Sequence, residues 1–162
     1  MSNIAGVYYN DTAAAPGMCV SVYFSGCPFH CPGCHNPEAQ DYSYGEPYTE
    51  KYKQKIIDSL NKNGVPRKLC ILGGEPLCDE NLEAVYDLML SVKENDLTVP
   101  IYIWTGYTFE QLLERSNQSI TLQKIFSLTY CIIDGLYEED KRDVTLHMRG
   151  SSNQRIIHLV NI

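Results

Sequence analysis

The amino-acid sequence predicts an α/β fold: a partial or open (β/α) barrel on a mostly parallel sheet of about five strands. Short apolar segments alternate along the chain with amphipathic segments of helical period. Parallel strands joined by right-handed helical crossovers produce this order. A complete eight-fold barrel takes about 250 residues, and this chain has 162. We therefore expect a single domain spanning 1–162 whose barrel is partial or open.

The first part of the chain is predicted to form a loop, a strand, a second loop and a helix. Residues 1–18 are expected to be an irregular lead-in, because they end in turn-forming proline and glycine. Residues 19–25 alternate apolar and polar side chains, which predicts a strand. Residues 37–47 hold two prolines and a glycine and should form a loop. Thr49 can cap a helix over 49–62.

The middle of the chain is predicted to contain two strands with a helix between them. Residues 68–72 form a short apolar run, which is typical of a buried strand. Asp79 can cap a helix that extends to about Glu94, with apolar side chains at helical spacing. Residues 100–104 are apolar and rich in β-formers, which predicts the next strand.

The last part is predicted to contain two short helices and two strands. The segment Thr108–Gln111 has the pattern of a capping box, and the helix it opens should bury Phe109, Leu112 and Leu113. A second helix is expected over 119–127. Strands are expected over 128–133 and 155–160, on either side of a polar loop at 136–154.

Composition limits the classes of function. Hydrophobic residues make up 44% of the chain and charged residues 20%, which predicts a packed core. The net charge of −7 and pI of about 5.0 disfavour broad nucleic-acid binding, which needs clustered Lys and Arg. No apolar run approaches the ~20 residues that span a membrane, and residues 1–11 lack the features of a secretory signal. Seven cysteines without an export signal indicate a reducing cytoplasm.

Three cysteines stand close together in the segment that follows the first predicted strand. Cys27, Cys31 and Cys34 have C-x3-C-x2-C spacing, and prolines and a glycine among them predict a loop, here called the cysteine loop (residues 26–36). Thiolates on a short loop form a site for soft metals. A cubane iron–sulfur cluster with full protein ligation takes four cysteines. A loop with three leaves one iron open for a small molecule, which indicates a cluster that reacts with a bound ligand.

Zinc and disulfide bonds are the alternatives for these cysteines. His30 or His35 could supply a fourth zinc ligand, although structural zinc sites usually pair two short ligand knuckles and this chain has one. A disulfide framework fits poorly, because seven is an odd number of cysteines. Cys19, Cys70 and Cys131 fall in predicted strands, where free cysteine packs as a small apolar residue, and the role of Cys78 stays open.

Special turns follow each of the predicted parallel strands. The cysteine loop, Gly73-Gly74, Thr105-Gly106 and Asp134-Gly135 come directly after a strand. Ligands of such sheets bind at the carboxyl ends of the strands, so we expect these turns on one rim with the cluster. In Gly73-Gly74-Glu75-Pro76 the glycines expose main-chain groups that could hold an ammonium or carboxylate, and Glu75 adds a charge. An ordinary strand-to-helix turn is the alternative.

The chain resembles the radical S-adenosylmethionine enzymes, and within them the activating proteins of anaerobic (class III) ribonucleoside-triphosphate reductase. Four segments carry this resemblance, of which the RGSSNQR part of the tail is the most discriminating: SGCPFHCPGCHN (25–36), GGEPL (73–77), WTGYTFEQL (104–112) and DGLYEEDKRD…MRGSSNQRI (134–156). The chain departs from many members of the wider superfamily at Gly33, where an aromatic residue is usual.

The resemblance implies an oxidoreductase with a 4Fe–4S cluster held by Cys27, Cys31 and Cys34. S-adenosyl-L-methionine would bind the open iron, and cofactor contacts would come from Gly33, Cys34, His35, Gly73, Gly74 and Glu75, with Gly74 and its neighbours at the methionine ammonium. A 5′-deoxyadenosyl radical would then generate a glycyl radical on the reductase, and no side-chain acid or base is needed.

The implied partners are the reductase large subunit and a low-potential electron donor such as flavodoxin or ferredoxin, and the chain could also form a homodimer. Activation of another glycyl-radical enzyme and non-catalytic electron transfer are the alternatives. The Arg149–Arg155 segment could be a solvated loop, or it could take part in docking of a partner or in binding of the cofactor.

Overall fold

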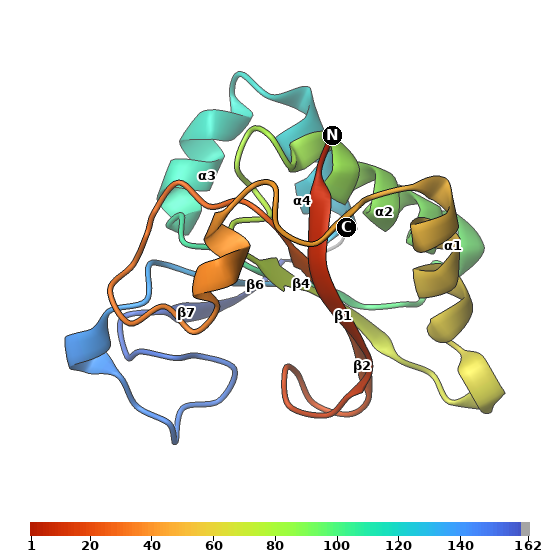
Figure 1. Ribbon diagram of the computed structural model, residues 1–162, viewed down its shortest axis with the longest axis horizontal. Coiled ribbons are helices and arrows are strands. Elements are labelled where there is room, and N and C mark those ends of the chain that lie inside the picture. The colour runs from red at the N-terminus through yellow and green to blue at the C-terminus, as the bar shows by residue number, and fades with distance from the viewer. Residues whose placement is uncertain (160–162) are drawn as a thin grey trace.

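The protein is a mixed α/β structure built on one open sheet (Figure 1), here described from a computed structural model for residues 1–159. The sheet has seven strands in the order β3-β1-β2-β4-β5-β6-β7. In chain order the strands are β1 (Asn3–Asp11), β2 (Cys19–Phe24), β3 (Glu46–Pro47), β4 (Lys68–Gly73), β5 (Ile101–Trp104), β6 (Cys131–Asp134) and β7 (Arg155–His158). The helices are α1 (Glu50–Ser59), α2 (Leu82–Asn95), α3 (Phe109–Ser116) and α4 (Ile120–Leu128).

The centre of the sheet is parallel, as the sequence predicts. Strands β2, β4, β5 and β6 pair in parallel, and Val22, Ile71, Ile103 and Ile132 lie opposite one another across it. These side chains are buried because helices cover the face on which they pack. Such burial explains the short, nearly continuous apolar runs of the parallel strands.

The expectation of about five strands was too low, because it omits β1 and β3, two of the three antiparallel strands that flank the parallel centre. Strand β1 occupies most of the predicted irregular lead-in and pairs with β2, with Val7 opposite Val22. Its register shifts twice, and these irregularities interrupt the period-two pattern that marks a strand. Strand β3 lies in the predicted loop 37–47 and is only 2 residues long, too short for a sequence signal.

The C-terminal strand also runs antiparallel. Strand β7 pairs with β6, and Arg155 Nη2 lies 2.5 Å from the buried carboxylate of Asp134 at the end of that strand. The start of the strand at Arg155 is confirmed. Its predicted end at Val160 lies outside the described residues.

Two of the three predicted helix caps are confirmed, the one at Asp79 is wrong, and the structure adds a cap at Ser119. The hydroxyls of Thr49, Thr108 and Ser119 accept hydrogen bonds from main-chain N–H groups of the following turn, and Thr108 forms the complete capping box. Helix α2 begins at Leu82 after Asn81, so Asp79 does not cap it. Asp79 instead forms an ion pair of 2.7 Å with Arg115 of α3.

Two predicted details of the helices also differ. Helix α1 ends at Ser59 rather than near 62, because residues 62–64 form a separate 3-10 turn. Leu113 is 47% exposed, so its predicted burial is wrong. Leu112 is buried and Phe109 is partly buried against the core, as predicted.

The two faces of the sheet are covered differently. The helices supply the larger core on one face. The other face carries a smaller buried cluster with Cys19, Cys70 and Cys131, which confirms that these cysteines are core residues. The cysteine loop (orange) and the segment after β6 (blue) lie together beyond the carboxyl ends of the strands (Figure 1). No helix among residues 1–159 is both long and apolar enough to cross a membrane.

Candidate functional site

A cavity of about 330 Å³ opens at the carboxyl ends of the parallel strands. Each special turn predicted on this rim contributes to it: the cysteine loop after β2, the turn after β4, Thr105-Gly106 after β5 and Gly135 after β6. The rim prediction is therefore confirmed. Aromatic and sulfur-bearing side chains complete the lining, namely Tyr23, Phe29, His35, Trp104, Tyr137 and Met148.

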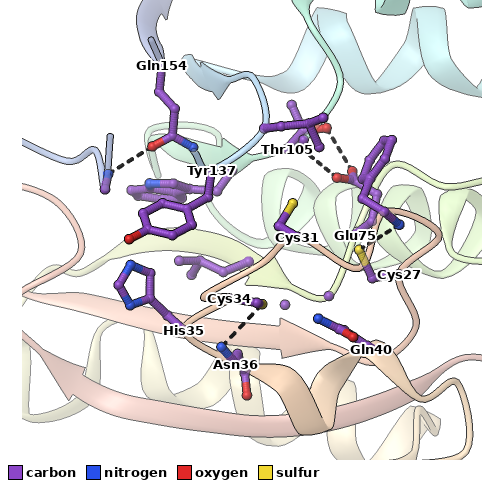
Figure 2. Close-up of a pocket in the computed structure, with 18 of the residues that line it drawn as sticks. Cys27, Cys31, Cys34, His35, Asn36, Gln40, Glu75, Thr105, Tyr137 and Gln154 are labelled. Carbon is purple, nitrogen blue, oxygen red and sulfur yellow. Dashed lines mark hydrogen bonds between the residues drawn. The ribbon is translucent and has the colours of Figure 1, made fainter. Parts of the chain in front are cut away.

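The structure brings the thiols of Cys27, Cys31 and Cys34 to this one cavity. All three are free thiols. The main chain fixes the loop at its start, where Gly26 N donates to Ala39 O at 2.7 Å. Main-chain N–H groups two residues ahead point at the sulfurs of Cys27 and Cys34, each at 3.5 Å, as the dashed lines in Figure 2 show. These contacts fix the thiols of Cys27 and Cys34 within the loop.

The donor set of the cavity fits an iron–sulfur cluster. The three cysteines are soft ligands, and all three line the same cavity. Burial raises the pKa of Cys27, with the Glu75 carboxylate adding to it. Burial also raises the pKa of Cys31, assisted by Cys34. Low-dielectric surroundings of this kind favour the thiolates only when cations balance their charge.

The histidines that could complete a zinc site lie differently. His30 is exposed, and its Nδ1 is 2.9 Å from Gln40 Oε1. His35 lines the cavity, and its ring packs on Tyr137 at 4.7 Å between centroids (Figure 2). Of the two histidines, His35 alone lies in the cavity with the three cysteines.

The turn after β4 is docked on the cysteine loop. Glu75 N donates to Gly26 O at 2.7 Å. A Cβ on Gly74 would overlap Gly26 O and lie 2.6 Å from Ala39 O, so only glycine allows this approach. Gly73, Gly74 and Glu75 all line the cavity, and their role in cofactor binding stays a prediction.

The side chain of Glu75 is satisfied by the protein itself. It is 1% exposed, and its carboxylate accepts hydrogen bonds from Gly106 N at 2.6 Å, Thr105 Oγ1 at 2.8 Å and Leu77 N at 2.9 Å. These bonds join the turns after β4 and β5 beneath the cavity (Figure 2). Glu75 therefore acts first as a brace between two cavity-forming turns.

Gly33 is the one predicted site residue that does not line the cavity. It is exposed and adopts φ +74°, a left-handed conformation that favours glycine. A Cβ there would also overlap the carboxylate of Glu139. The departure from an aromatic residue at this position therefore has a local structural reason.

Sequence reasoning missed part of the cavity wall. Tyr137, Met148, Gly150 and Gln154 line it, and all four belong to the predicted loop 136–154. A polar loop has no periodicity that could mark such residues. The only available signal was the resemblance of the tail, which did not assign individual roles.

The environment of Glu75 predicts a pH-dependent stability. Burial raises its pKa from 4.5 to about 7, although hydrogen bonds from Gly106, Thr105 and Leu77 oppose the shift. Between these pH values the folded state keeps a proton that the unfolded state has lost. The contribution of this group to the free energy of unfolding is therefore at its maximum below pH 4.5. It is lost as the pH rises through 7, and the free energy of unfolding falls by roughly 3 kcal/mol.

Urea unfolding of the cluster-free chain between pH 4.5 and 8 measures this loss. Glu75→Gln should flatten the pH dependence, whereas Glu114→Gln, at an exposed helical position, should keep the wild-type slope. Equal slopes for wild type and Glu75→Gln would contradict the prediction.

Comparison with known proteins agrees with this geometry. The family described as "4Fe-4S single cluster domain" matches residues 13–157. Proteins named "anaerobic ribonucleoside-triphosphate reductase-activating protein" are similar over nearly the whole chain. That of Escherichia coli is 31% identical over 153 residues, covering 94% of this chain and 96% of the relative. That of Vibrio cholerae is 34% identical over 154 residues, covering 93% and 94%. That of Enterobacteria phage T4 is 30% identical over 154 residues, covering 95% and 92%. The chain therefore belongs to the family of anaerobic ribonucleoside-triphosphate reductase-activating proteins.

Proposed function

We propose that this chain is a radical S-adenosylmethionine enzyme that activates an anaerobic ribonucleoside-triphosphate reductase by generating a glycyl radical on it. The observation that carries the proposal is the convergence of Cys27, Cys31 and Cys34, without a fourth cysteine, on one cavity in the described chain. When bound, a 4Fe–4S cluster supplies the electron that cleaves S-adenosylmethionine to methionine and the 5′-deoxyadenosyl radical. The protein orients the cofactor and excludes water from the site.

The roles of the remaining residues follow from where they lie. Gly73 and Gly74 present main-chain groups to the cavity and would hold the methionine ammonium. Glu75 holds this turn against the turn after β5. His35 and Tyr137 form an aromatic wall that would exclude water from the cofactor. Gly33 would contribute by shaping the loop beside Cys34.

Several finer points of the proposal come from the sequence. The open sheet would be the portion of a (β/α) barrel that curves around the cofactor. The direct partner is the large subunit of the reductase, and a flavodoxin or ferredoxin would deliver the electron. A homodimer and a cytoplasmic location stay predictions. The RGSSNQR tail favours the reductase over other glycyl-radical enzymes as the target.

An anaerobic assay tests the proposal. The chain is reconstituted with iron and sulfide, reduced and mixed with S-adenosylmethionine, with and without an anaerobic ribonucleotide reductase. We expect 5′-deoxyadenosine in both samples and a glycyl-radical signal only with the reductase. Cleavage without the radical would redirect the proposal to another glycyl-radical enzyme. A filled cluster that cleaves nothing would favour a non-catalytic electron-transfer protein.

A further inference from the structure

Three polar side chains of the RGSSNQR segment bind the main chain of the residues that follow β6. We call Ser151, Asn153 and Gln154 the latch, and residues 135–138 the strap. Gln154 Nε2 donates to Gly135 O at 3.0 Å, and Asn153 Nδ2 donates to Leu136 O at 2.7 Å. Ser151 Oγ accepts from the N–H of Glu138 at 3.1 Å. The latch thus contacts the strap at its beginning, middle and end.

The same glutamine also fixes its own loop. Gln154 Oε1 accepts from Gly150 N at 2.8 Å and Ser151 N at 3.2 Å. Its side chain therefore joins two segments that have no helix or strand of their own (Figure 2). Side-chain hydrogen bonds of this kind replace the regular ladder that would otherwise hold such segments.

The strap forms part of the cofactor cavity. Leu136 and Tyr137 line it, and the Tyr137 ring packs on His35. The strap also borders a second hollow of about 460 Å³, whose lining includes Cys31. The strap therefore separates two cavities beside Cys31 of the cysteine loop. A shift of the strap would open the wall between them.

The loop that Gln154 fixes supports the same aromatic pair. A Cβ on Gly150 would lie 3.1 Å from Tyr137 Cδ1 and 3.3 Å from His35 Nε2, so the main chain here lies close to both rings and leaves little room for a side chain. Two residues earlier, Met148 O accepts a hydrogen bond of 2.9 Å from the indole Nε1 of Trp104. Trp104 thus reports on the position of this loop.

We propose that Ser151, Asn153 and Gln154 position the strap and Gly150, so that Tyr137 and His35 form one fixed wall of the S-adenosylmethionine cavity. They are positioning residues, because they act through Tyr137 and His35. The hydrogen bonds described above are the evidence for the latch itself, whereas the identity of the ligand rests on the proposed function.

The first test uses the only tryptophan of the chain, Trp104, and needs no cluster. Acrylamide quenching of its fluorescence is measured in the full chain and in Gln154→Met, which keeps the length of the side chain and removes its polar atoms. We expect stronger quenching in the variant. Gln154→Glu keeps an acceptor for the two N–H groups and should fall between. Gln54→Met, on the exposed face of α1, is the matched control and should match wild type.

The second test measures the dissociation constant of S-adenosylmethionine on the reconstituted protein. Loss of the hydrogen bonds of Gln154 should raise it roughly tenfold, with Gln154→Glu again intermediate and the control unchanged. Gly150→Ala should weaken binding while leaving the latch bonds in place. A tenfold rise of the dissociation constant in Gln154→Met that is partly reversed in Gln154→Glu would not follow from a general loss of stability.

The outcomes separate the latch from the proposed function. Wild-type quenching and wild-type affinity in Gln154→Met would overturn the latch. If the wild-type protein does not bind S-adenosylmethionine, the proposed function fails, and the quenching test still decides whether the latch orders the wall. If Gln154→Met does not fold, Asn153→Ala replaces it in both tests. Asn153 Oδ1 has no hydrogen-bond partner in the described structure, so this truncation removes a single bond.

Discussion

Serine at any one of positions 27, 31 or 34 is expected to abolish the iron–sulfur cluster and, with it, cleavage of S-adenosylmethionine. Cys27, Cys31 and Cys34 are the cysteines that line the cavity within the described chain, so none has a substitute. A hydroxyl is a hard, weakly acidic donor that replaces a thiolate poorly on iron. Iron and sulfide content and visible absorption after anaerobic reconstitution measure the cluster, and 5′-deoxyadenosine measures cleavage.

Cys131→Ser is the matched control for these variants. Cys131 is fully buried in the smaller core, away from the cavity lining, and the substitution makes the same change from sulfur to oxygen. A buried hydroxyl costs stability, of order 1–3 kcal/mol, but the cluster should form with full iron content. The cavity variants should show the opposite result, with stability close to wild type and no cluster. A single cavity variant that kept full iron and cleavage would show that its thiol is not a ligand.

The sequence was sufficient for the parallel centre of the fold because burial leaves a simple pattern there. Strands β4, β5 and β6 are short apolar runs with helices between them, and the glycine-containing turns at their ends are local signals. Strand β1 follows a different rule. It is held by pairing with β2, and its two register shifts remove the alternation that a single sequence could show. Strand β3 exists only because β1 lies beside it.

The same division applies to helix caps. Thr108 caps α3 through a local pattern of residues that a sequence displays. Asp79 has equally good local chemistry, but Arg115 of α3 pairs with it across the fold. Helix α2 begins after Asn81, whose side chain donates to Ser25 O and Glu75 O, at 2.9 and 3.1 Å. The choice between Asp79 and Asn81 therefore depends on tertiary contacts.

The candidate site divides in the same way. Its cysteines and the glycines after β4 lie in compact motifs, and their spacing identified them. The opposite wall comes from Tyr137 of the strap and from Gly150 and Gln154 of the segment bonded to it. No spacing rule relates these residues to Cys31. Their roles follow from hydrogen bonds that only the folded chain displays.

Alanine at Gly74 is expected to destabilise the protein and to impair the site at the same time. Its Cβ would overlap Gly26 O and lie 2.6 Å from Ala39 O. Both are main-chain atoms of the segment that holds Cys27, and Gly26 N donates to Ala39 O, so neither can rotate away. Relief requires the cysteine loop and the turn after β4 to separate. We expect a loss of about 1–3 kcal/mol in the free energy of unfolding, measured with urea.

The functional loss in Gly74→Ala should exceed what this destabilisation explains. Separation of the two segments would lengthen the Glu75 N to Gly26 O hydrogen bond and move the main-chain groups that face the cavity. Below the urea transition, where the variant is folded, affinity for S-adenosylmethionine should therefore fall at least about tenfold.

Gly6→Ala is the matched control, because it makes the same change where no atom lies within 4 Å of the new Cβ. Neither glycine has a positive φ, so the pair compares available space and not backbone strain. Gly6→Ala should be neutral or slightly stabilising through the unfolded state. Wild-type affinity in Gly74→Ala, with Gly6→Ala equally active, would mean that the turn after β4 does not position the cofactor. Loss confined to Gly74→Ala would assign that task to the contact between this turn and the cysteine loop.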